Sequence, residues 1–303
     1  MEKRLTRSDY LFIFVFIFML VAAVGAFFYG VQIGRHEMQT QYAKLHPGDD
    51  AVKKQPSAYE QQVLVSFYHT IYSPFREFQN KWSADMEAIA APDATTDVKS
   101  LLKGLQRLAN EKYSAIQHIT LPQNSPLLLD AQTGYMKSLR LFASGADRLL
   151  EKQADDGIKW ADAVRNDSYI TEAKRFALHS QLQFYDAIVL WNETVDPTLT
   201  PVDAKSGLSL NLWEKLNLNE KNRYLAAWLS ENMVFANFYP QDLAIDIDDM
   251  IAKGNAKKMR LSTVDDIAAT LVNSAGVRAG DFNNGKAKYY RNERLPQLPF
   301  FID

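Results

Sequence analysis

Apolar residues recur every three or four positions between residues 58 and 195, in four successive segments. The segments run from Leu64 to Ile89, from Val98 to Ile119, from Leu128 to Leu149 and from Ile170 to Trp191. This spacing is typical of helices that bury one face. Its average, about 3.5 residues, favours nearly antiparallel packing in a bundle. We therefore predict an all-α fold with a four-helix bundle over residues 58–195, in up-down-up-down order.

Capping and proline signals separate these segments. They are Pro92-Asp93 before the second segment, Ser125 as N-cap and Pro126 as first residue of the third, and Asp167 or Ser168 as N-cap of the fourth. Ser73-Pro74 interrupts the first segment, because proline lacks the N–H that a helix interior needs. We expect a kink or a restart of the helix there.

Residues 196–303 predict a smaller helical region that ends in an apolar tail. After a linker at 196–207, the pattern predicts helices over Leu208–Asn237, Leu243–Lys253 and Ser262–Ala275, the last with a capping box of Ser262 and Asp265. Asn283-Asn284-Gly285 indicates a hairpin turn. The tail, Leu295 to Ile302, is too apolar to remain in water, so we expect it to pack on its own domain; the alternative is docking on a partner. Whether this region is a separate domain or flanks the bundle stays open.

A single uncharged and mostly apolar run, Tyr10–Gly34, precedes the bundle. Roughly 20 apolar residues suffice to cross a bilayer as a helix, so we predict a transmembrane helix here. Basic residues concentrate in residues 1–9, which predicts a short cytoplasmic N-terminus and places residues 35–303 outside the cytoplasm. His46-Pro47-Gly48 marks residues 35–57 as a tether. The alternative is a cleaved signal peptide with Val24-Gly25-Ala26 at its cleavage site.

Four small residues lie on one face of this predicted helix. They are Ala22, Ala26, Gly30 and Gly34, each four positions after the last. Small residues at that spacing allow two membrane helices to approach closely. We predict that this face is a helix–helix contact and that the chain forms a homodimer or pairs with another membrane helix.

Composition excludes several kinds of chemistry. The chain has no cysteine, so disulfides, thiolate nucleophiles, Cys–zinc sites and iron–sulfur clusters are excluded. It has 34 basic and 36 acidic residues and a net charge of −2. Because no basic field attracts a polyanion, we expect no nucleic-acid partner.

Three short motifs are similar to those of penicillin-binding proteins and serine β-lactamases. They are Ser100-x-x-Lys103, Ser230-x-Asn232 and Lys205-Ser206-Gly207. In that family the serine is the nucleophile and a sheet strand carries the Lys-x-Gly element. Here that element precedes Ser-x-Asn, and the pattern predicts no sheet. The polar face of a helix explains Ser100 and Lys103, and we predict no catalytic residues.

Candidate metal ligands are also explained by ordinary helix surfaces. Glu111 and His118, like Glu172 and His179, lie seven residues apart, about 10 Å along a helix axis. That distance is too long for one ion, unlike the Glu-x-x-His spacing of di-iron bundles. Asp246-x-Asp248-Asp249 lacks the glycine and the final acid of a calcium loop. We read it as a solvated acidic helix end, and we predict no metal and no cofactor.

These observations predict a single-pass membrane protein whose extracytoplasmic helical domain acts by protein–protein contact. Its predicted role is that of an assembly, scaffold or accessory factor at a bacterial cell envelope. One alternative is an ectodomain that binds or senses a ligand. A second alternative is an envelope enzyme of a kind that the sequence does not reveal.

Overall fold

The structure is a computed structural model that describes residues 58–92, 96–151, 160–196 and 207–302. All of these belong to one compact unit, Pro56–Asp303. The described residues are helical and have no strands, apart from an isolated bridge between Ser209 and Thr263. The prediction of an all-α fold is therefore confirmed. The predicted transmembrane helix, Tyr10–Gly34, lies outside the described residues, and none of the described helices is long and apolar enough to span a membrane.

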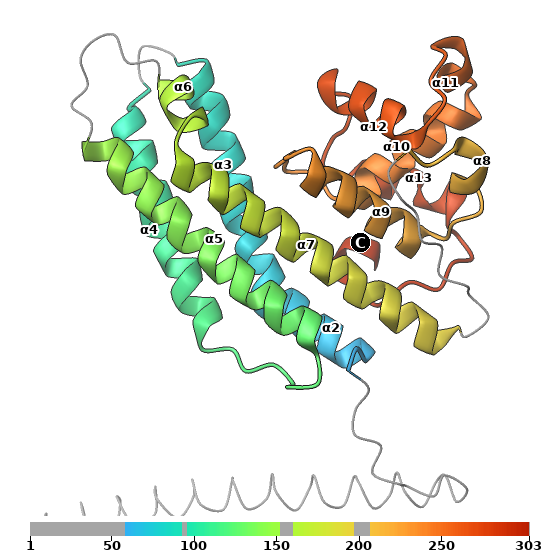
Figure 1. The fold of residues 1–303 in the computed structure, drawn as a ribbon, viewed down its shortest axis with the longest axis horizontal. Helices are drawn as coiled ribbons and strands as arrows, with labels where there is room; N and C mark the ends of the chain where they lie inside the picture. The colour runs from blue at the N-terminus through green and yellow to red at the C-terminus, as the bar shows by residue number, and fades with distance from the viewer. Residues whose placement is uncertain (1–57, 93–95, 152–159, 197–206, 303) are drawn as a thin grey trace, which may run out of the picture. The chain divides into compact units, whose positions relative to one another are not determined.

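Long helices form the bundle that the apolar spacing predicted. They are the continuous run of α2 (Gln61–Phe67), η1 (Tyr68–Tyr72) and α3 (Ser73–Ala90), followed by α4 (Val98–Gln117), α5 (Pro126–Glu151) and α7 (Ser168–Val195), with the short α6 (Trp160–Arg165) before α7. Successive long helices run in opposite directions (Figure 1). Helix α5 packs against both α4 and α7.

The predicted interruption at Ser73-Pro74 takes the form of a π-helical turn. Helix η1 has the wider i to i−5 hydrogen bonding, and the Ser73 N–H donates to the Tyr68 carbonyl. Pro74 then stands within the first turn of α3, where its missing N–H is tolerated. The helix axis therefore continues through the proline.

The predicted starts of two long helices, α5 and α7, are confirmed. Asp167 accepts hydrogen bonds from the Tyr169 and Ile170 N–H groups at the start of α7. Helix α5 begins at Pro126, so Ser125 holds the predicted N-cap position, and its carbonyl accepts from the N–H groups of Leu128 and Leu129 at 3.1 Å. The Ser125 hydroxyl donates to the Ala58 carbonyl. The Tyr59 hydroxyl accepts from the Leu127 N–H at 3.3 Å, so a distant residue satisfies this helix end.

Seven shorter helices lie in the described part of the C-terminal region, residues 207–302. They are α8 (Leu210–Trp213), α9 (Leu218–Glu231), α10 (Pro240–Ala252), α11 (Asn255–Lys258), α12 (Val264–Asn273), α13 (Asp281–Tyr289) and α14 (Pro299–Ile302). The prediction of one helix over Leu208–Asn237 was wrong, because Asn217 caps a new helix, α9. The predicted capping box lies one residue later, formed by Thr263 and Asp266.

The Asn-Gly pair predicted as a hairpin turn lies within α13 instead. A Cβ on Gly285 would stand 2.5 Å from Cγ1 of Ile245 on α10. The glycine therefore permits close packing of two helices. Asp242 of α10 strengthens the same contact, because its carboxylate accepts from the N–H groups of Gly280 and Phe282 at 3.1 and 3.0 Å.

A buried arginine joins the bundle to the C-terminal region. Arg76 of α3 is 4% exposed, and its guanidinium donates to the Asn237 carbonyl and, at 3.0 Å, to Oε1 of Gln79. The guanidinium also lies 4.1 Å from the centre of the Tyr239 ring. Gln79 in turn donates to the Ala236 carbonyl at 2.6 Å. The turn before α10 is thus fixed to α3, and residues 207–302 flank the bundle.

The apolar tail packs on this junction, as predicted. The Phe300 ring lies 5.3 Å from both Tyr68 and Tyr239, centre to centre, and 6.3 Å from Tyr185 of α7. Leu298 is fully buried. Figure 1 shows the C-terminus beside α7 and α9. The tail therefore closes the junction between the bundle and the C-terminal region.

Replacing Arg76 by leucine should destabilise the chain by roughly 2–4 kcal/mol, since each buried acceptor left unpaired costs about 1–3 kcal/mol. Arg140 offers a matched control: it also covers a tyrosine ring, that of Tyr113 at 4.3 Å, but it is exposed. Arg140→Leu should change the unfolding free energy by about 0.5–1 kcal/mol at most. Urea unfolding followed by circular dichroism measures both, and equal losses would contradict the role of Arg76.

Candidate functional site

The residues predicted from the sequence do not converge on one site. Ala22, Ala26, Gly30 and Gly34 lie outside the described residues, as do Lys205 and Ser206. Ser100 and Lys103 are exposed on α4, whereas Ser230 belongs to α9 and Asn232 follows it. Figure 1 shows α4 and α9 on opposite sides of the unit, with α5 and α7 between them. The three acyl-enzyme motifs therefore do not come together.

Three of the four candidate metal ligands contact neighbouring residues, and the fourth, His179, is exposed on α7. Glu172 pairs with Arg175 at 2.5 Å, and Glu111 lies 3.5 Å from Lys112. His118 contacts the Gln117 amide at 3.2 Å. Within the described ranges, no three Asp, Glu or His side chains are placed to hold a metal ion.

The acidic segment at the end of α10 differs from the solvated helix end that we predicted. Asp248 is buried, and its carboxylate accepts from Nζ of Lys221 at 3.0 and 3.1 Å and from Nε1 of Trp213 at 2.7 Å. The Tyr290 hydroxyl also donates to it. Because both charges of this ion pair are buried, its partners are fixed in place. Asp248 thus connects α8, α9 and α10.

Asp249 and Asp246 of the same segment line a shallow groove of about 360 Å³ beside Met250, Lys253 and Met259. Hydrogen bonding to Lys253 lowers the pKa of Asp249 to about 2. Burial and the nearby Asp281 carboxyl raise the pKa of Asp246 to about 7. Around pH 5 the Asp249 carboxyl is therefore ionised, whereas the Asp246 carboxyl is protonated and neutral.

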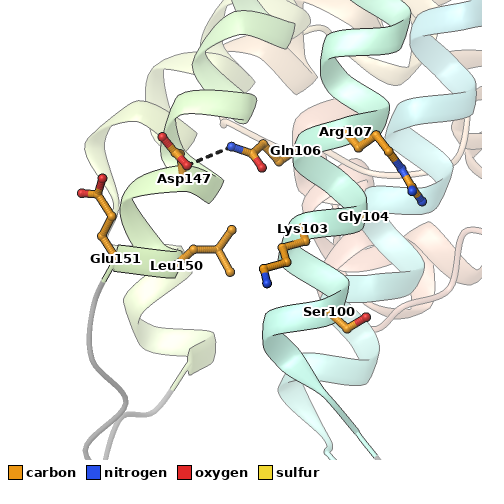
Figure 2. A pocket seen from close by; sticks show the side chains of 8 residues that line it. All are labelled: Ser100, Lys103, Gly104, Gln106, Arg107, Asp147, Leu150 and Glu151. Carbon is orange, nitrogen blue, oxygen red and sulfur yellow. Dashed lines mark hydrogen bonds between the residues drawn. The ribbon is translucent and has the colours of Figure 1, made fainter.

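A larger groove of about 560 Å³ lies between the start of α4 and the end of α5. Helix α4 contributes Ser100, Lys103, Gly104, Gln106 and Arg107, and α5 contributes Asp147, Leu150 and Glu151. In Figure 2 the Lys103 and Leu150 side chains extend toward each other across it. Gln106 donates to Asp147 at 2.9 Å and fixes the two helices to each other.

Charge is divided between the two sides of this groove, which we call the α4–α5 groove. Lys103 and Arg107 stand on α4, and Asp147 and Glu151 stand on α5. Within the described part of the chain, no salt bridge forms to Lys103, Arg107 or Glu151. These exposed charges are available to a binding partner.

Gly104 forms the bare part of the α4 side of the groove. A Cβ there would meet no atom within 4 Å. Other described glycines have evident reasons: Gly285 and Gly145 touch isoleucine side chains, and Gly207, Gly254 and Gly280 have positive φ. Glycine inside a helix costs roughly 0.5–1 kcal/mol relative to alanine. At Gly104, no packing contact among the described residues compensates for this loss of stability.

Sequence reasoning missed the junction at Arg76, the Lys221–Asp248 pair and the α4–α5 groove. The sequence contains a signal for the groove alone, since a glycine inside a strongly patterned helix calls for a reason. Comparison with family models, curated proteins and solved structures gives no match to this chain.

Gly104→Ala should stabilise the chain by about 0.5–1 kcal/mol, because the new methyl group has room and the helix gains propensity. Gly285→Ala, the matched control, should destabilise it by about 1–3 kcal/mol through overlap with Ile245. Urea unfolding compares the two variants. Loss of stability in Gly104→Ala would contradict the open surroundings of Gly104.

The raised pKa of Asp246 predicts a pH dependence of stability. Between about pH 4 and pH 7 the folded chain binds more protons at this group than the unfolded chain, so its contribution to the free energy of unfolding falls as the pH rises. Asp246→Asn should make that fall smaller. Asp249→Asn should instead lower the free energy of unfolding by the same amount at pH 5 and pH 8, because the stabilisation it removes is fully present above about pH 4. Urea titrations at pH 5 and pH 8 distinguish the two behaviours.

Proposed function

We propose that this chain is a single-pass membrane protein of a bacterial cell envelope, with its helical unit outside the cytoplasm. In this proposal the unit works as an assembly, scaffold or accessory factor through protein–protein contacts. The apolar run Tyr10–Gly34, with basic residues before it, supports the anchor and the orientation. The proposal concerns the described unit as the part that binds partners.

The placement of the charged side chains supports a binding role. Inside the described unit, charged side chains hold helices together, whereas charged side chains without a salt bridge lie on its outer surface. Arg76 holds the turn at Asn237, and Lys221 holds Asp248. Both groups have partners that fix helices to each other. Lys103, Arg107 and Glu151 have no such partner and line an open groove. Exposed charges without an internal role are suited to recognition of another surface.

A ligand-binding role is the second candidate, and the volume of the α4–α5 groove favours it. A volume of about 560 Å³ falls within the range of small-molecule sites, roughly 300–1,000 Å³. Such sites are mostly apolar and enclose the ligand, whereas four of the eight residues here carry a formal charge. In Figure 2 two of these, Arg107 and Glu151, extend away from the gap between α4 and α5. The protein-contact role therefore fits this groove better.

A membrane-impermeant lysine cross-linker, added to spheroplasts that express the full chain, tests the anchor and the protein contacts together. We expect the chain in the membrane fraction and in cross-linked species heavier than the monomer. A chain without residues 1–34, directed to the same compartment, is the control; it should leave the membrane fraction and cross-link less. An unmodified full chain would contradict the orientation, and a modified monomer alone would contradict action through protein contacts.

A further inference from the structure

The charge pattern of the α4–α5 groove is complementary to that of a second copy of the same groove. One side carries Lys103 and Arg107, and the other carries Asp147 and Glu151, so the four formal charges sum to zero. A two-fold axis places the same patch of two copies face to face, so that residue i meets residue j and residue j meets residue i. When that axis runs along the groove, the basic side of each groove faces the acidic side of the other.

The α4 side is also shaped for close approach of a helix. Gly104 lies one turn after Ser100, and small residues four apart share a helix face. Nothing in the described structure occupies the space above the Gly104 Cα. A bulky residue there would project into the groove of about 560 Å³ that α4 and α5 enclose. A helix seated in the groove would contact the α4 backbone at this point.

We propose that the occupant of the α4–α5 groove is α4 of a second copy of this chain, with the two-fold axis passing near Gly104. Each Arg107 then faces Glu151 of the other copy, and each Lys103 faces the acidic side formed by Asp147 and Glu151. This inference rests on the proposed function, because it names the partner of the same surface. It also explains why a helix-weakening glycine stands at an open position.

A second copy fits the groove better than an unrelated partner. A partner with one sign of charge would be repelled by one side of the groove, since Lys103 and Arg107 oppose Asp147 and Glu151. A second copy offers an acidic side to the basic side of the groove and a basic side to the acidic side. The two-fold axis repeats each contact, so each favourable ion pair between the copies forms twice in the dimer.

Cysteine cross-linking in the full chain gives a direct test, because the chain contains no cysteine of its own. A disulfide requires Cα atoms about 4.4–6.8 Å apart, a distance that only a residue near the axis meets. Gly104→Cys, oxidised in membranes, should give a disulfide-linked dimer. Glu231→Cys is the control, since Glu231 is exposed on α9, which lies on the opposite side of the unit from α4. It should remain monomeric. Equal cross-linking of the two variants, or none with Gly104→Cys, would overturn the proposal.

Charge exchange provides a second measurement on the Gly104→Cys background. Arg107→Glu should lower the yield of the cross-linked dimer on the order of tenfold, because it places like charges together in both copies. Adding Glu151→Arg should restore the yield, because both pairs re-form with exchanged signs. Failure of the double variant to recover, while circular dichroism shows it folded, would contradict the predicted pairing.

These outcomes separate the two proposals. If the impermeant cross-linker traps the chain in larger species but Gly104→Cys forms no dimer, the protein-contact function stands and the groove is not the dimer surface. If neither experiment yields a species larger than the monomer, both proposals fail. A dimer through Gly104→Cys that survives Gly30→Leu and Gly34→Leu shows that the groove associates independently of the predicted membrane helix.

Discussion

The buried guanidinium of Arg76 is the constraint on which the rest of the unit depends. An arginine stays charged in a protein, and a charge removed from water is costly unless polar groups surround it. Here no carboxylate among the described residues forms an ion pair with it, so backbone and amide oxygens must compensate. The Asn237 carbonyl and Gln79 do so only while the turn before α10 stays against α3. The position of Tyr239, and with it the seat of Phe300, follows from that contact.

The protein-contact role that we propose depends on the outer surface of the unit, because the buried polar groups serve packing. Burial raises the pKa values of the Tyr72, Tyr135 and Tyr185 hydroxyls, so they remain neutral beside Arg76. Polar groups here maintain the packing of helices from both halves of the unit. The free charges and the unexplained glycine lie in the α4–α5 groove. A scaffold that presents a fixed outer surface needs this division between internal and external polar groups.

The helices of the bundle could be predicted from the sequence because burial of one helix face leaves a local record. The apolar spacing from Leu64 to Trp191 and the cap at Asp167 depend on residues a few positions apart. The errors arose where distant residues decide. Gly285 serves contact with Ile245 of another helix rather than a turn. Asp248 looked like a surface acid because Lys221, its partner, lies 27 positions earlier. The sequence placed Ser100 and Lys103 on a polar face, but it did not show that α5 lies beside them and completes a groove.

The central claim is that the bundle and the C-terminal region form one cooperative unit, held at Arg76. The most direct measurement is equilibrium unfolding of two variants of the full chain, one retaining only Trp82 and the other only Trp213, with the remaining tryptophans replaced by phenylalanine. Trp82 lies in α3 and Trp213 in α8, and both are buried. The account predicts that fluorescence of the two tryptophans changes at the same urea concentration and with the same slope. Two separate transitions, with one region unfolding while the other stays folded, would contradict it.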